Sequence, residues 1–308
     1  MGLRIRTNVA SINSQRRLER ATLAVSDSAG KLSSGKRINK AADDAAGLAI
    51  ASNLNADVRS LSQAKRNAND GISLVQTAEG GLVETTSMLT RLRELAVQGA
   101  SDTVGATERG FLDKEFVALK DEIDRIANSV EFNGTRLLVG EKDIPDELAN
   151  PPGTNPLEIQ ISKDYYQDVD NVDNRNQVNI IKIDLKSINA FTDGEGSLGI
   201  GEAFDGTRVV DKESAQNSIM KLDDAIVKVS EHRAYLGSIQ NRLQSTVNNL
   251  GVQVENLTAA RSRIEDTDFA HETARFTSEK ILQQAGSSVL TQANSFPQTA
   301  LNLVQSLG

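Results

Sequence analysis

Residues 112–130 read LDKEFVALKDEIDRIANSV, and their apolar side chains recur at gaps of four, three, four, three and four residues. Gaps of three and four place side chains on one face of an α-helix, whereas a strand alternates every second residue. The stretch therefore predicts an amphipathic helix whose single apolar stripe packs lengthwise against another helix. The stripe consists of Leu112, Phe116, Leu119, Ile123, Ile126 and Val130.

Longer stripes of the same kind lie before and after this one. If residues 44–98 form one helix, it is roughly 80 Å long at about 1.5 Å per residue. Helices from the two halves of the chain can then pack along one another. We expect a mainly α fold, an elongated antiparallel helical bundle or coiled coil. The two stripes are Leu54, Val58, Leu61, Ala68, Ile72, Val75, Leu82, Leu89 and Leu92, and later Leu236, Ile239, Leu243, Val247, Leu250, Val254, Leu257 and Ile264.

The two ends of the chain carry apolar stripes of their own. A single helix of this length is only marginally stable in water, and burying one Leu or Ile contributes about 1.5–3 kcal/mol. We therefore expect the ends to be disordered in the isolated chain and helical once paired. Pro297 predicts a kink or a fresh helix start in the last segment. The residues expected to pack between subunits are Ile5, Val9, Ile12, Leu18, Val25, Leu32, Val289, Phe296, Leu303, Val304 and Leu307.

The middle of the chain has a different pattern. Four of the five prolines lie between Pro145 and Pro156, and residues 157–161 and 181–185 alternate apolar and polar side chains. This predicts a small β-hairpin region in a turn-rich insert. The expected segments are terminal helix 1–43, body helices 44–140, insert 141–211, body helix 212–269 and terminal helix 270–308.

The composition excludes several classes of protein. Only 4% of the 308 residues are aromatic and there is no Trp, which argues against a broad globular core. No cysteine is present, so no disulfide or thiolate metal site is expected. The net charge is −8, although residues 1–40 carry nine basic and two acidic side chains. That basic arm lacks aromatic residues and any nucleic-acid motif, so we expect no nucleic-acid partner. The alternating N-terminus predicts neither a cleaved signal peptide nor membrane insertion.

Motifs that suggest chemistry are incomplete. Gly194, Gly196 and Gly199 form a G-x-G-x-x-G, but the sequence after them predicts a loop where a dinucleotide fold needs a helix. His271 and Glu272 begin an H-E-x-x-H, but Arg275 stands at the second zinc-ligand position. The acidic loop of Asp168, Asp170 and Asp173 lacks the closing Glu of a calcium loop. We expect no catalytic residue, no cofactor and no metal, and thus no enzyme.

Several runs together resemble bacterial flagellin. Residues 32–50, LSSGKRINKAADDAAGLAI, resemble its N-terminal half, as do QTAEG at 76–80 and RELAVQ at 93–98. Residues 236–242, LGSIQNR, and 263–268, RIEDTD, resemble its C-terminal half. The resemblance covers about 1–140 and 212–308. It implies a secreted, extracellular subunit that self-polymerises into the flagellar filament for motility, with 1–43 and 270–308 as the filament core.

The resemblance also implies partners. These are a flagellar export chaperone over the C-terminal helix, the type III export apparatus, and the hook-associated and cap proteins. Toll-like receptor 5 is a further candidate, and the positions that match its contact residues are Arg91, Leu95 and Glu115. A simpler interpretation is that Leu95 belongs to a helical seam and that the two charged residues pair with neighbouring subunits.

Two alternative functions stay open at this point. A hook-filament junction protein shares such terminal helices, although its segment equivalent to Ala41–Ala45 typically carries prolines around the paired aspartates. A filament subunit with hydrolase activity would need a metal site in the insert, which contains no His or Cys.

Overall fold

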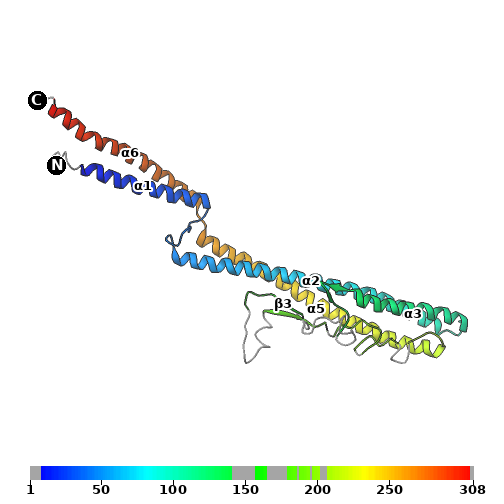
Figure 1. Ribbon diagram of the computed structural model, residues 1–308. Coiled ribbons are helices and arrows are strands. Elements are labelled where there is room, and N and C mark those ends of the chain that lie inside the picture. The colour runs from blue at the N-terminus through cyan, green and yellow to red at the C-terminus, as the bar shows by residue number, and fades with distance from the viewer. Residues whose placement is uncertain are drawn as a thin grey trace, which may run out of the picture. The chain divides into compact units, whose positions relative to one another are not determined.

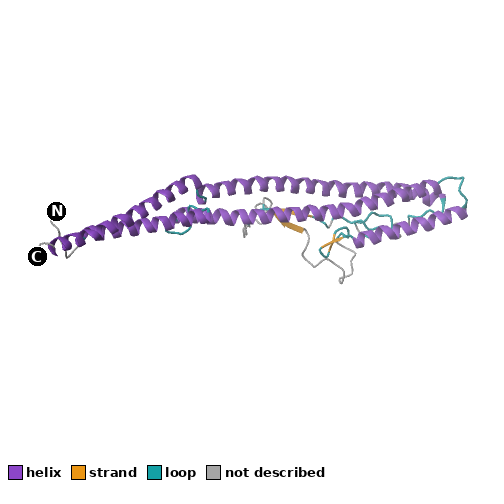
Figure 2. Ribbon diagram, turned by 90° about the horizontal axis from the view of Figure 1, so that it is seen from above, coloured by secondary structure: helices purple, strands orange, loops and turns teal. Residues whose placement is uncertain are grey.

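The computed structural model confirms a mainly α fold. For residues 296–305 the structure describes only the backbone. Within the described residues there are five helices and two small antiparallel sheets (Figures 1 and 2). The structure describes residues 8–140, 157–164, 179–185, 187–194, 196–201 and 207–305. The helices are α1 Val9–Ser34, α2 Ala45–Gly99, α3 Ala106–Ser129, α5 Lys212–Glu265 and α6 Phe269–Gln305.

The chain divides into two compact units. The terminal unit comprises Met1–Val58 and Glu255–Gly308, and the body unit comprises Arg59–Val254. Both divisions fall inside long helices, because α2 and α5 each contribute to both units. The segment boundaries expected at 43/44 and 269/270 instead lie close to the ends of helices, where α1 gives way to α2 and α5 to α6.

The body unit has one apolar core, to which α2, α3 and α5 all contribute. Phe116 and Ile123 of α3 are fully buried there, and Leu112 and Leu119 pack against it, as the first stripe predicts. The long stripes behave in the same way. Their buried members in the body unit are Ala68, Val75, Leu82, Leu89 and Leu92 of α2 and Leu236, Ile239, Leu243 and Val247 of α5.

Helix α2 continues through its glycines, and two of them face close neighbours. A methyl group on Gly71 would overlap the Ile159 side chain, and one on Gly81 would lie 2.7 Å from Leu138. The absence of a side chain therefore lets the β region approach the helix. Glycine costs a helix roughly 1 kcal/mol relative to alanine, and α2 nevertheless runs through both positions.

The expected β-hairpin region is present. Strands β3 Leu157–Gln160 and β4 Ile180–Ile183 pair antiparallel, with Ile159 opposite Ile181. A second hairpin joins β1 Glu131–Phe132 to β2 Thr135–Arg136. Its turn residues, Asn133 and Gly134, have φ of 51° and 78°. Asn-Gly is the preferred dipeptide for such a turn, so the sequence itself carries a signal for this second hairpin.

Helix α6 runs unbroken from Phe269 to Gln305, so the fresh helix start expected at Pro297 is wrong. No helix in the described part of the chain is long and apolar enough to cross a membrane.

Candidate interaction surface on the terminal helices

Helix α1 has well-defined ends and lies antiparallel to α6 in the terminal unit (Figure 1). Asn8 caps its first turn, since its Oδ1 accepts a hydrogen bond from Ser11 N at 3.1 Å. Gly35 ends the helix in a left-handed conformation with φ of 70°, and its N–H donates to Lys31 O at 2.9 Å. The local sequence therefore fixes where α1 begins and ends.

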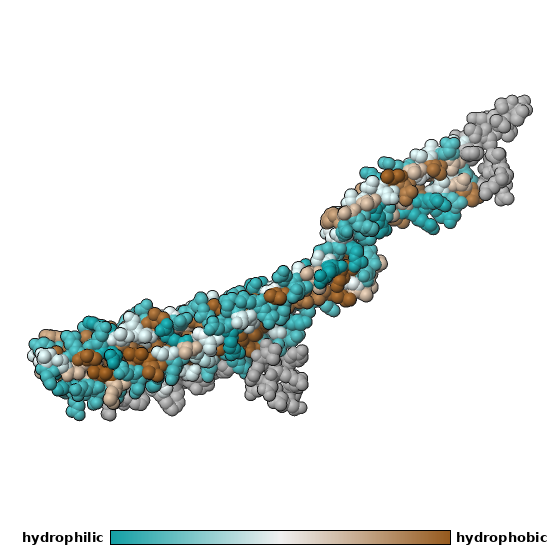
Figure 3. Space-filling view, turned by 180° about the vertical axis from the view of Figure 1, so that it is seen from behind, coloured by the Kyte–Doolittle hydropathy of each residue, from teal (hydrophilic) through white to brown (hydrophobic). Residues whose placement is uncertain are grey.

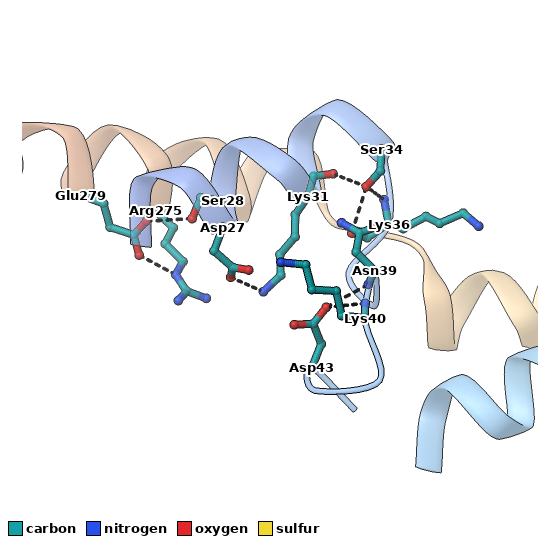
Figure 4. Close-up of polar contacts among 10 residues, drawn as sticks. All are labelled: Asp27, Ser28, Lys31, Ser34, Lys36, Asn39, Lys40, Asp43, Arg275 and Glu279. Atoms are coloured by element: carbon teal, nitrogen blue, oxygen red, sulfur yellow. Dashed lines mark hydrogen bonds and ion pairs between the residues drawn. The ribbon is translucent and has the colours of Figure 1, made fainter. Parts of the chain in front are cut away.

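Polar side chains join α1 to α6. Ser28 is fully buried and its hydroxyl donates to Glu279 Oε2 at 2.8 Å, while Arg275 Nε donates to Glu279 Oε1 at 2.9 Å (Figure 4). Further along the seam, Gln283 Nε2 donates to Thr22 Oγ1 at 3.1 Å. Specific hydrogen bonds thus contribute to the pairing of the two helices, and the pairing does not bury all their apolar side chains.

Many large apolar side chains of α1 and α6 remain on the outside. Their exposed fractions lie between 47% for Ile12 and 66% for Leu23. Figure 3 shows hydrophobic residues on the surface of this helix pair. A soluble monomer rarely leaves contiguous apolar surface uncovered, and such surface marks an interaction site. The exposed residues are Val9, Ile12, Leu23, Phe269, Ile281, Leu282 and Val289.

A groove of about 590 Å³ lies on this surface between the two helices. Leu282, Ala285 and Val289 of α6 line it with apolar side chains, and Arg17 and Arg20 of α1 line it with basic ones. Glu279 adds a carboxylate, so the groove combines apolar surface with charges of both signs.

The sequence-predicted packing residues fall into three groups. Val9, Ile12 and Val289 are exposed in the single chain, whereas Leu18, Val25 and Leu32 are partly buried. Ile5 and Leu307 lie outside the described residues, as do the side chains of Phe296, Leu303 and Val304. Leu23 and Leu282 were missed because each lies off the main stripe of its helix.

The connection between α1 and α2 is held to the end of α5 and to the α5–α6 connection by hydrogen bonds and one ion pair. Arg37 N donates to Glu265 O at 2.7 Å, and Thr267 N donates to Gly35 O at 3.0 Å. Arg37 Nη2 also donates to Ile264 O at 2.6 Å, and Lys36 forms an ion pair with Glu265. This connection is part of the run LSSGKRINKAADDAAGLAI, and these contacts show why its charged residues matter.

The paired aspartates of the same run shape the turn before α2. The Asp43 carboxylate accepts hydrogen bonds from Lys40 N and Asn39 N, each at 2.9 Å, which lower the pKa of Asp43 (Figure 4). Asp44 Oδ1 accepts from Gly47 N at 2.8 Å at the start of α2. A side chain at Gly47 would overlap Asp44, so the glycine permits this cap.

The candidate receptor residues cluster on α2 and α3. Arg91 Nη2 donates to Glu115 Oε1 at 2.9 Å, and Arg91 Nη1 donates to Glu94 Oε2 at 2.9 Å. Both charged residues are about half exposed and pair within the chain itself. Leu95 is 1% exposed and belongs to the core of the body unit.

The incomplete chemical motifs do not form sites in the described residues. Gly194, Gly196 and Gly199 all adopt positive φ in an irregular segment. His271 lies on α6, and no group of three metal-ligating side chains occurs in the part of the chain that the structure describes. The acidic loop 168–173 lies outside the described residues.

Taken with the fold, these features define a class: a helical structural protein with an uncovered surface on its paired termini. The family description "Bacterial flagellin N-terminal helical region" matches residues 5–143, and "Bacterial flagellin C-terminal helical region" matches 219–304. The flagellin of Bacillus subtilis (strain 168) is 40% identical, covering 98% of this chain and 100% of that protein. The chain belongs to the bacterial flagellin family.

A further relative agrees with this assignment, and one solved structure shares the fold. The flagellar filament 33 kDa core protein of Treponema phagedenis is 38% identical, covering 98% of this chain and 99% of that protein. A solved structure described as a flagellar hook-associated protein from Vibrio parahaemolyticus has a TM-score of 0.54, covering 73% of this chain and 100% of that one. At 14% identity it shows the fold alone.

The chain is a structural subunit of the flagellar filament, an extracellular appendage, and its family supports self-polymerisation. Flagellins are structural proteins, in agreement with the expectation that this chain is not an enzyme. The comparisons give no support to a junction protein or to a filament subunit with hydrolase activity.

Proposed function

We propose that α1 and α6 form the filament core by burying their exposed apolar faces against neighbouring copies of the chain. The observation that carries this proposal is the exposure of Leu23, Leu282 and Val289 beside a seam that hydrogen bonds already close. Burying each such side chain contributes about 1.5–3 kcal/mol, and several together offset the cost of association. The packing residues predicted from the sequence are part of this proposal.

Segments 1–43 and 270–308 make up the core in this account, 44–140 and 212–269 the surrounding body, and 141–211 the exposed insert. We propose that the terminal helices become ordered only on assembly. The support is the amount of apolar surface that the α1–α6 pair leaves in water, together with the marginal stability of helices that lack tertiary packing.

Export partners follow from the same surface. The chain is exported through the flagellar type III apparatus in this proposal, and a dedicated chaperone covers Ile281, Leu282 and Val289 before assembly. The absence of cysteine is compatible with such export, because no disulfide has to form or open. The cap and hook-associated proteins then contact the same terminal helices at the ends of the filament. No catalytic role is proposed.

Recognition by Toll-like receptor 5 is a separate proposal. Arg91 and Glu115 supply the exposed charged contact, while Leu95, which is buried, keeps α2 in place beneath them. Receptor-reporter cells treated with the monomer test this idea. Arg91→Ala should weaken signalling, and unchanged signalling by a folded Arg91→Ala variant would contradict the contact.

The assembly proposal is tested by seeded filament growth of Leu282→Asp, followed by negative-stain electron microscopy. Leu282 is 60% exposed in the single chain, so its replacement leaves that chain's own packing intact. Burying an unpaired carboxylate between subunits costs several kcal/mol, so elongation should stop while thermal unfolding of the body unit is unchanged.

The matched control is Gln284→Asp, which adds the same charge at an exposed polar position two residues further along α6. Because two residues correspond to more than half a helical turn, this carboxylate lies on another face. Gln284→Asp should elongate seeds as the wild type does. Normal elongation by Leu282→Asp, or equal loss in both variants, would show that the Leu282 face is not the assembly surface.

A further inference from the structure

The carbonyl of Ala293, in the interior of α6, lacks the usual donor four residues later in the helix. In an α-helix each C=O accepts from the N–H four residues later. The residue four positions after Ala293 is Pro297, which has no N–H, and α6 nevertheless continues to Gln305. Ala293 is 9% exposed, so water has little access to make up for the missing bond. The gap therefore needs a donor from elsewhere in the protein.

Asn8 supplies that donor from α1. Its Nδ2 donates to Ala293 O at 2.8 Å, while its Oδ1 accepts from Ser11 N at 3.1 Å. The carbonyl partner requires the NH₂ group, and the N–H partner requires the oxygen, so the two contacts together fix the orientation of the amide. One side chain thus begins α1 and satisfies α6.

A neighbouring contact reinforces the same alignment. The hydroxyl of Ser11, which is 8% exposed, donates to Asn294 Oδ1 at 2.7 Å. The first turn of α1 is thereby joined to the turn of α6 that precedes Pro297. Apolar stripes alone specify a helical register weakly, because a slip by one turn still places Leu and Val against similar neighbours. A slip here would leave the Ala293 carbonyl without a partner.

We infer that Asn8 is the positioning residue that sets the register of α1 on α6, by donating the N–H that Pro297 lacks. The inference rests on the proposed function, because a fixed register matters where many copies must present identical surfaces. It predicts that the NH₂ donor of Asn8 is needed only while residue 297 is proline, whereas the oxygen that caps α1 is needed in either case.

A double-mutant cycle on the full-length chain tests this dependence. Asn8→Asp keeps the oxygen that caps α1 but removes the donor, and Pro297→Ala gives Ala293 a helical donor. The measurement is the critical concentration for elongation of wild-type seeds. Asn8→Asp should raise it about three- to tenfold in the wild-type background, as the loss of one buried hydrogen bond predicts, and less than about twofold in the Pro297→Ala background.

The matched control is Asn13→Asp on the same helix. Asn13 is exposed, and its Oδ1 accepts from Arg16 Nη2 at 3.0 Å, a role that a carboxylate also fills. This variant should behave as the wild type does. An equal effect of Asn8→Asp in both backgrounds, or no effect in either, would overturn the inference although assembly itself proceeds.

Failure of the wild-type chain to elongate seeds would instead contradict the proposed function. The same four chains would then be compared by hydrogen exchange of residues 269–295 in polymer precipitated with salt, because these helices are proposed to be ordered only on assembly. Faster exchange in the Asn8→Asp precipitate that Pro297→Ala removes would still support the register role. Identical exchange in all four precipitates would refute it.

Discussion

Single polar residues hold loop segments in position where no apolar stripe contacts them. Asp113 of α3 accepts from Arg208 Nη2 at 2.7 Å and from Val209 N at 3.1 Å. Burial opposes its ionisation, but these hydrogen bonds and the charge of Lys120 outweigh burial and lower the pKa of Asp113. Sequence spacing could not predict this contact, because its partners lie more than ninety residues away along the chain.

We predict that Asp113→Asn destabilises the body unit at pH 7 by about 1–3 kcal/mol, the usual cost of losing a hydrogen-bonded charge partner. A lowered pKa contributes stability above the unfolded value of about 3.9 and loses it as the pH falls through the folded value. The difference between variant and wild type should therefore shrink below about pH 4. Thermal unfolding followed by circular dichroism at pH 7 and pH 3 measures it.

Asp124, on the same helix, provides the contrasting case. It accepts from Thr192 N and Thr192 Oγ1, each at 2.8 Å, but burial raises the pKa of Asp124 and the nearby Asp193 and Asp121 add to the rise. The folded chain thus disfavours its charged form, and stability is lost as the pH rises through the folded pKa. Asp124→Asn should change stability at pH 7 by less than about 0.5 kcal/mol. A loss as large as that of Asp113→Asn would contradict this account.

At the scale of elements, periodicity predicted the helices well. Gaps of three and four residues put the apolar side chains of α2, α3 and α5 on one face of each helix, and that face packs into the body core. Periodicity could not show what each stripe packs against. In the terminal unit, Ser28 and Thr22 lie in the seam while Leu23 lies outside, an arrangement that a stripe alone does not reveal.

Deletion of residues 281–308 tests the role of α6 as an element. The truncated chain should stay soluble and keep its body unit folded, because the body core draws on α2, α3 and α5. It should fail to extend seeds, since the exposed face from Ile281 to Val289 is gone. Circular dichroism checks the fold and electron microscopy checks growth. Filament growth at the wild-type rate would show that α6 beyond residue 280 is dispensable.

At the scale of the whole molecule, two regions far apart in the sequence both match the bacterial flagellin family. Residues 5–143 and 219–304 match the two flagellin regions, while the residues between them hold the insert. The runs near Asp43 and Asp266 identified the family from the sequence, and the structure explains them through the backbone contacts around Arg37. The proposed assembly surface could not be predicted fully from the sequence, because it consists of apolar side chains that the single chain leaves exposed.

The central claim is that the exposed apolar faces of α1 and α6 become buried between copies. A cryo-electron microscopy reconstruction of filaments grown from the purified chain tests it most directly. We predict that Leu23, Leu282 and Val289, each more than half exposed in the single chain, contact apolar side chains of neighbouring subunits. A filament held together by body-unit contacts alone, with these three side chains still facing solvent, would contradict the account.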